Sequence, residues 1–181
     1  MAIKRLTIDG YGQVELNNVA FRRDGRIEAQ CKLDATDFAT GAENGMLVAV
    51  DKVNKKIIHA DEDYPLGIIY SAEKLYNPLE GGLKNFKNEL DGFLPRVGYI
   101  AVGDLFTTNC FEYDSAEFST EVALKSALAA YATTAVYAGI GTTGAFDLSA
   151  TAPTAGPVLK VVENTTMPDG QLGIKLQVMS I

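Results

Sequence analysis

Residues 161–181 read VVENTTMPDGQLGIKLQVMSI, and the alternation within this stretch decides the fold class. Apolar side chains recur at every second position, which is the period of a strand with one buried face: Leu172, Ile174, Leu176 and Val178. Residues 167–170, Met-Pro-Asp-Gly, have turn chemistry, because proline fixes φ and glycine accepts a positive φ. We therefore expect a strand over 171–180 that is either laid into a sheet of this chain or pressed against a partner protein.

Short strand-like runs separated by turn residues fill most of the chain upstream of this segment. Five dipeptides are of the kind favoured where φ turns positive: Asp9-Gly10, Asp24-Gly25, Asn44-Gly45, Asp91-Gly92 and Asp169-Gly170. The strand-like runs lie at 3–8, 45–51, 56–60, 65–72, 96–103, 105–113, 134–140, 144–149 and 157–163. We expect 45–51 and 56–60 to form a hairpin through the polar turn 52–56.

Residues 14–34 predict a further hairpin. Val19 and Phe21 lead into a turn at residues 23–26, Arg-Asp-Gly-Arg. Apolar and polar residues then alternate, and the apolar positions predict one buried face: Ile27, Ala29, Cys31 and Leu33.

Two segments depart from the strand pattern. Residues 119–132 predict a helix, since four residues fall at i, i+3, i+4 and i+7: Leu124, Ala127, Leu128 and Tyr131. Asp114, Ser115 and Ser119 are its candidate start residues. Residues 82–91 suit either a short amphipathic helix or an ordered loop.

Strands followed by one helix and more strands do not alternate as in a parallel α/β fold. The sequence therefore predicts a mainly β protein, an antiparallel barrel or sandwich with one or two short helices. With 181 residues, 47% of them hydrophobic, a chain of this size buries roughly 70% of its unfolded surface. We expect one domain over 1–181, with residues 73–95 as a candidate small subdomain.

The charge and the apolar runs of the chain argue against certain classes of partner, and its cysteines bear on the compartment. A net charge of −7 argues against binding nucleic acid through its phosphates, which takes concentrated Lys and Arg. The basic residues at 22–26 and 52–56 flank apparent turns, where we expect them to be solvated. The N-terminal residues carry no apolar leader, and no run approaches the ~20 apolar residues of a membrane span. We therefore expect no membrane partner and a cytosolic product whose two cysteines, Cys31 and Cys110, are reduced.

Residues 139–144, Gly-Ile-Gly-Thr-Thr-Gly, match the glycine spacing of a dinucleotide-binding loop. Such a loop must open a helix whose N-terminus receives the pyrophosphate. The continuation AFDLSATAPTAGP (145–157) contains β-formers and two prolines, so no helix can follow. We expect a connection between strands and no cofactor.

His59 is the single histidine, and Asp61, Glu62 and Asp63 follow it closely. A zinc or iron site draws on several converging nitrogen or sulfur ligands, so we interpret residues 59–64 as a solvated loop between two strands. Cys31 belongs to the apolar face of its run, where a small hydrophobic role is favoured over nucleophilic catalysis. Motifs of serine hydrolases, P-loop proteins and zinc proteases are missing from the sequence. We predict no catalytic residue and no metal site, although any two carboxylates can meet in a fold.

Two segments, TAGPVLKVVENTTMPDGQLGIKLQVM (154–179) and LPRVGYIAVGDLFTTN (94–109), resemble small virion structural proteins of tailed bacteriophages. The likeness covers the C-terminal half and lies in its strands and turns, so no catalytic residues come with it. It implies a head decoration or cement protein, often trimeric, that binds the outside of the shell of the major capsid protein. A tail or head–tail connector protein is the alternative within this class.

The physical features fit a binding role as well. An acidic chain suits the outside of a particle better than its DNA-filled interior, so we expect it on the head surface after synthesis in the host cytoplasm. Apolar alternating segments can join a neighbour's sheet by strand addition. The residues we expect at a partner or sheet edge are Ile3, Leu6, Ile8, Leu172, Ile174, Leu176 and Val178. The alternative from another class is a small β-barrel that binds a ligand or acts as an enzyme through His59, the acids at 61–63 and the 139–144 loop.

Overall fold

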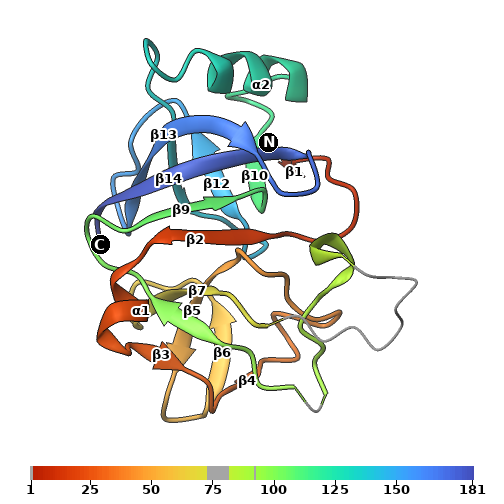
Figure 1. Ribbon diagram of the computed structural model, residues 1–181, viewed down its shortest axis with the longest axis vertical. Helices are drawn as coiled ribbons and strands as arrows, with labels where there is room; N and C mark the ends of the chain where they lie inside the picture. The colour runs from red at the N-terminus through yellow and green to blue at the C-terminus, as the bar shows by residue number, and fades with distance from the viewer. Residues whose placement is uncertain (1, 73–81, 92) are drawn as a thin grey trace.

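The computed structural model describes residues 2–72, 82–91 and 93–181. Within these ranges the chain forms two β-sheets and two short α-helices (Figure 1). The large sheet has eight strands in the order β1 (Ile3–Arg5), β10 (Phe111–Asp114), β12 (Phe146–Ser149), β11 (Tyr137–Ile140), β13 (Val158–Thr166), β14 (Leu172–Ser180), β9 (Leu105–Thr108), β2 (Val14–Asn18). The small sheet has six, in the order β3 (Ile27–Glu28), β8 (Val97–Tyr99), β7 (Leu66–Ile69), β5 (Leu47–Asp51), β6 (Lys56–His59), β4 (Lys32–Leu33).

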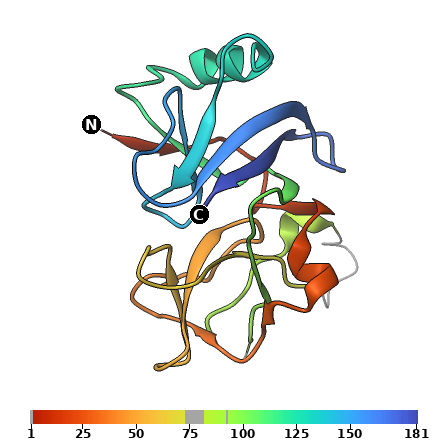
Figure 2. The same ribbon diagram turned by 90° about the vertical axis from the view of Figure 1, so that its left-hand side faces the viewer.

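The two sheets form a sandwich-like fold, which confirms the mainly β prediction and selects the sandwich over the closed barrel. In Figures 1 and 2 the large sheet occupies the upper half of the molecule and the small sheet the lower half. Most neighbouring strands are antiparallel, as expected. Both sheets are nevertheless mixed, because β10 pairs with β12 in parallel and β4 pairs with β6 in parallel.

The core lies between the sheets and extends behind the small one. Strand β5 has all five residues buried, with Leu47 and Ala49 in the cluster between the sheets. Val48 and Val50 point to a second cluster on the opposite face of β5. A strand buried on both faces needs a continuous apolar run rather than an alternating one. The hairpin of β5 and β6 is paired in antiparallel register, as predicted.

The predicted hairpin over 14–34 is wrong. Residues Ala20–Asp24 form a short helix, α1, and its two flanking strands belong to different sheets, β2 beside β9 and β3 beside β8. Phe21 explains this, because its ring is fully buried on the Gly98 backbone, where a Cβ would lie 2.3 Å from the ring. Gly25 ends the helix at φ 68°, so the Asp-Gly dipeptide caps a helix instead of closing a hairpin. Of the predicted inward residues, Cys31 and Leu33 are buried, whereas Ile27 is 40% exposed and Ala29 is exposed.

Helix α2 (Glu121–Ala129) falls within the predicted segment 119–132. Its apolar face packs as expected: Leu124 and Leu128 are fully buried, and Ala127 and Tyr131 lie against the same cluster. The cap is Thr120 rather than Asp114, Ser115 or Ser119, because the Thr120 hydroxyl accepts a hydrogen bond from the Ala123 N–H at 3.2 Å.

The segment 82–91 is an ordered loop rather than an amphipathic helix. It holds one 3₁₀ turn, Leu83–Asn85, followed by irregular chain in which Phe86 is buried. The candidate subdomain over 73–95 falls partly outside the described residues, which begin again at 82.

The strand predicted over 171–180 is laid into the large sheet. β14 pairs with β13 along one edge and with β9 along the other, and both pairings are antiparallel. Gly170 adopts φ 85° in the turn that joins β13 to β14. Among the described residues, neither α-helix has the length and apolarity that crossing a membrane requires.

Candidate functional site

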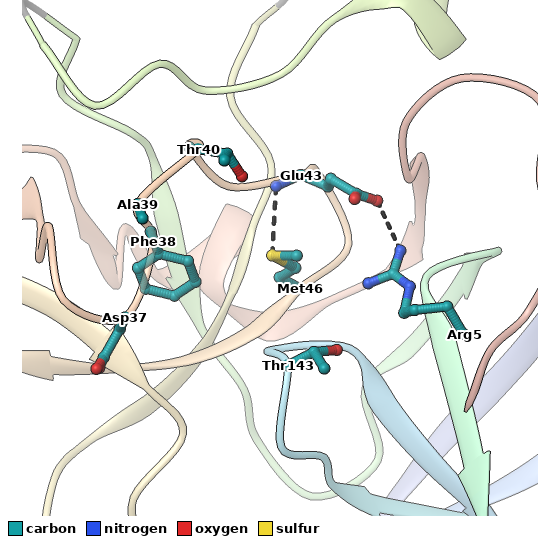
Figure 3. A pocket seen from close by; sticks show the side chains of 9 residues that line it. Arg5, Asp37, Phe38, Ala39, Thr40, Glu43, Met46 and Thr143 are labelled. Carbon is teal, nitrogen blue, oxygen red and sulfur yellow. Dashed lines mark hydrogen bonds and ion pairs between the residues drawn. The ribbon is translucent and has the colours of Figure 1, made fainter. Parts of the chain in front are cut away.

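A polar pocket lies where β1 meets the loop that precedes β5 (Figure 3). We call it the Arg5 pocket; its volume is about 320 Å³ and it is lined by Arg5, Asp37, Phe38, Ala39, Thr40, Gly41, Glu43, Met46 and Thr143. In Figure 3 the side chains of Arg5 and Glu43 point toward each other across it. β1 supplies Arg5, the loop supplies residues 37–46, and Thr143 comes from the turn between β11 and β12.

Glu43 ties three segments of the chain together. One of its carboxylate oxygens lies 2.7 Å from the Arg5 guanidinium and accepts a hydrogen bond from the Gly12 N–H at 2.6 Å. The Glu43 N–H in turn donates to the Met46 sulfur at 3.3 Å. Because both ionic side chains are partly shielded from water, this pair contributes more than an exposed ion pair does. Its role is to fix strand β1 against the loop before β5.

Beside the pocket, Glu112 is a fully buried carboxylate of β10. Thr142 donates to it through its N–H and, at 3.0 Å, its hydroxyl. Thr143 donates through its N–H at 3.2 Å and also through its hydroxyl. The amides of the glycine-rich loop, which in a dinucleotide site would face a phosphate, bind the chain's own carboxylate. The 139–144 segment is thus the turn of a hairpin between β11 and β12, as the strand-connection interpretation predicts.

Cys110 lies at the inner end of this cluster and is fully buried. Burial raises the pKa of its thiol to about 12, which keeps the sulfur neutral and unreactive at physiological pH. Cys31 is buried as well, and neither cysteine forms a disulfide. Both therefore serve as small apolar side chains, and the structure gives neither the exposure that a catalytic thiol needs.

Asp147 on β12 is the direct neighbour of Glu112 across the parallel pair. One of its oxygens is buried and accepts no hydrogen bond from the described residues. Burial raises the pKa of Asp147 to about 6, with further contributions from the negative charges of Glu112, Glu117 and Asp114. A carboxyl group with this pKa exchanges its proton in mildly acidic solution.

We expect the substitution Asp147→Asn to stabilise the fold above pH 6 and to have little effect near pH 4. The folded-state pKa of about 6 lies above the ordinary 3.8, so the folded protein binds the proton more tightly and loses stability as pH rises between these values. This difference corresponds to at most about 3 kcal/mol. Solvent that reaches the outer part of the side chain screens it, so we expect a gain of about 1 kcal/mol.

Denaturant unfolding of both proteins at pH 4 and pH 7.5 measures this gain. The control is Asp24→Asn, which removes an exposed carboxylate and should change the free energy of unfolding by less than about 0.5 kcal/mol. Equal stabilisation by Asp147→Asn at both pH values contradicts the assignment.

Of the other predicted candidates, His59 contacts two residues that line the Arg5 pocket, and residues 61–63 lie in a separate loop. The His59 ring packs edge-on against Phe38, with ring centroids 4.8 Å apart, and its backbone N–H donates to Asp37. Residues 61–63 form an exposed loop between β6 and β7 in which Asp61 accepts from the Asp63 N–H. Within the described parts of the chain, no group of three or more His, Cys, Asp or Glu residues is arranged to hold a metal ion.

The seven residues expected at a partner or sheet edge separate into two groups. Six lie in or against the core between the sheets: Leu6, Ile8, Leu172, Ile174, Leu176 and Val178. The chain itself therefore covers the apolar face of β14. Ile3, on the outermost strand of the large sheet, is 41% exposed and stays available to a partner.

Sequence reasoning missed Arg5, Glu43, Glu112 and Asp147. A signal existed for two of them, because Glu112 and Asp147 interrupt apolar strands at FEY (111–113) and FDL (146–148). A charged residue inside such a run marks a buried polar contact. Arg5 and Glu43 carried no comparable signal, since each pairs with a residue distant in the sequence.

Comparison with protein-family models, with curated proteins and with solved structures finds no match to this chain.

Proposed function

We propose that this chain is a structural protein of a tailed bacteriophage virion, a decoration protein that binds the outside of the major capsid protein shell and stabilises it. The two segments that carry the resemblance, 94–109 and 154–179, supply β8, β9, β13 and β14. Three of these strands are neighbours in the large sheet. The observation that carries the proposal is the free edge of that sheet at β1.

Among the strands of the described residues, β1 ends the large sheet and has β10 along only one side. The Leu6 N–H donates to the Phe111 carbonyl at 2.9 Å, and the Ser115 N–H donates to the Ala2 carbonyl at 3.2 Å. Because backbone groups alternate along an antiparallel strand, those of Ile3 and Arg5 point away from β10. In Figure 2 the N-terminal strand projects at the outer side of the upper half of the molecule.

An edge of this kind accepts an extended segment of another protein by strand addition. The exposed Ile3 side chain offers that segment an apolar contact beside the backbone hydrogen bonds. An extended arm of the major capsid protein is the partner we assign to it. The net charge of −7 disfavours contact with packaged DNA, so the chain suits the exterior of the head.

We expect Ile3→Asp to weaken binding to the shell without lowering the melting temperature. The added charge lies beside the side chains of the incoming strand on one face of the sheet, whereas Ile3 contributes little to the core of the free protein. The measurement is cosedimentation with expanded capsids that lack the protein, together with their resistance to heat. Val53→Asp is the matched control, because Val53 is 91% exposed and lies in the turn between β5 and β6 of the small sheet.

Failure of the wild-type protein to bind such capsids or to copurify with virions would reject the decoration role. The number and position of copies on the virion distinguish a decoration protein from a tail or connector protein. A decoration protein is spread over the head, whereas a tail or connector protein is confined to one site. Virions labelled at this chain and imaged by electron microscopy give that answer.

A further inference from the structure

A second pocket lies at the seam between the sheets, on the side of α1. We call it the cationic pocket; its volume is about 420 Å³ and its lining residues are Leu16, Arg22, Ile27, Tyr70, Ala72 and Arg96. The two arginines come from α1 and from the residue before β8, so tertiary structure alone brings them together. Leu16 and Ile27 provide apolar wall beside the two positive charges.

The guanidinium groups of Arg22 and Arg96 lack a counter-ion within the described part of the chain. No ion pair there includes either of them, although seven others form. Burial raises the pKa of the Tyr70 phenol, and the positive charges of Arg96 and Arg22 partly oppose this rise. Tyr70 is held in place by the Phe21 ring, with centroids 5.1 Å apart. The pocket thus presents two cations and an apolar wall on a chain of net negative charge.

The loop between β6 and β7 is negatively charged, in contrast to the cationic pocket. Asp61, Glu62 and Asp63 are all exposed, and no described lysine or arginine forms an ion pair with them. Tyr64 follows them with 36% of its surface exposed. We call residues 61–64 the acidic loop. It offers carboxylates to guanidinium groups and an aromatic ring to an apolar wall, and tyrosine and arginine are both enriched at protein interfaces.

The acidic loop cannot reach the cationic pocket of its own chain. The loop precedes β7, whereas Tyr70 and Ala72 follow it, so the two features stand at opposite ends of this strand. At about 3.3 Å per residue, the four residues of β7 alone separate them by roughly 13 Å. Arg96 lies at the Tyr70 end too, because its N–H donates to the Ser71 hydroxyl at 3.0 Å.

We propose that the cationic pocket of one copy binds the acidic loop of a second copy. The carboxylates of Glu62 and Asp63 pair with Arg22 and Arg96, and the Tyr64 ring packs against Leu16 and Ile27. Two different surfaces meet in this contact, so it is head-to-tail. Such contacts form a closed ring when the rotation that relates neighbouring copies divides evenly into a full turn. The contact supplies the homo-oligomer that the decoration role calls for, but its test requires no capsid.

A charge swap tests the contact. Arg22→Glu with Arg96→Glu inverts the pocket, and Glu62→Lys with Asp63→Lys inverts the loop while leaving the Asp61 turn intact. In sedimentation velocity at low salt, from micromolar to millimolar protein, wild type should self-associate and each swapped variant should remain monomeric. Combining both swaps in one chain should restore association, because the charges are complementary again. Added salt should weaken it in wild type.

Glu89→Lys with Asp91→Lys is the control, because it changes the net charge as the loop swap does at another exposed segment. This control variant should associate as wild type does. A wild-type chain that stays monomeric, or a combined variant that fails to regain association while folding normally, overturns the proposal. A monomeric chain that still binds capsids overturns this contact and leaves the decoration role standing.

Discussion

Replacing Leu176 with aspartate should leave almost no soluble folded protein. Leu176 is fully buried at the centre of β14, with Val161 of β13 on one side and Phe106 of β9 on the other. Loss of the buried leucine costs about 2–5 kcal/mol, and an unpaired carboxylate in an apolar core adds several more. The sum approaches the roughly 5–15 kcal/mol that stabilises a whole domain.

The measurement is the soluble fraction on expression, followed by thermal unfolding of whatever is recovered. Met179→Asp is the control on the same strand, since Met179 is 47% exposed and should tolerate the charge. Leu172→Asp should fall between the two because Leu172 is half-buried at the start of the strand. A soluble Leu176→Asp protein with an unchanged melting temperature contradicts the placement of β14 between β13 and β9.

Glu112→Ala should lower the free energy of unfolding by about 3 kcal/mol at pH 7. The substitution removes the acceptor of four hydrogen bonds from Thr142 and Thr143. Hydrogen bonds to a charged group contribute about 1.5–3 kcal/mol each to stability. Thr142 and Thr143 are exposed, so water can replace part of these bonds. Relief of the repulsion with Asp147 offsets part of the loss, which is why the expected total is smaller than four such bonds.

Equilibrium unfolding in urea measures this loss, and amide exchange at residues 141–145 reports whether the turn loosens. Glu117→Ala is the matched control: Glu117 also accepts hydrogen bonds near the end of β12, from Ser149 and Ala150, but it is exposed. We expect Glu117→Ala to lower the free energy of unfolding by less than about 1 kcal/mol. Equal losses from the two variants contradict a special role for the buried carboxylate.

The candidate site was less predictable than the fold, for a physical reason. A buried carboxylate is recognisable in sequence only as an exception inside an apolar run, and its partners can lie anywhere in the chain. Glu112 and its threonine donors are about thirty residues apart. Arg5 and Glu43 are 38 residues apart and meet only in the folded chain. The glycine-rich loop shows the same limit, since its spacing matched an anion-binding loop while the anion it binds is Glu112.

Local patterns in the sequence were sufficient for the mainly β class, the helix at 121–129, the β5–β6 hairpin and the strand at 172–180. These elements depend on residues a few positions apart, and the periodicity of the apolar residues indicates which face is buried. Only the tertiary structure decided that residues 20–24 form a helix, that β14 lies inside the chain's own sheet and that β1 is the outermost of the described strands. Each of these follows from contacts between distant segments, such as Phe21 on Gly98 and Leu176 beside Phe106, and distant contacts leave no periodic trace in a single sequence.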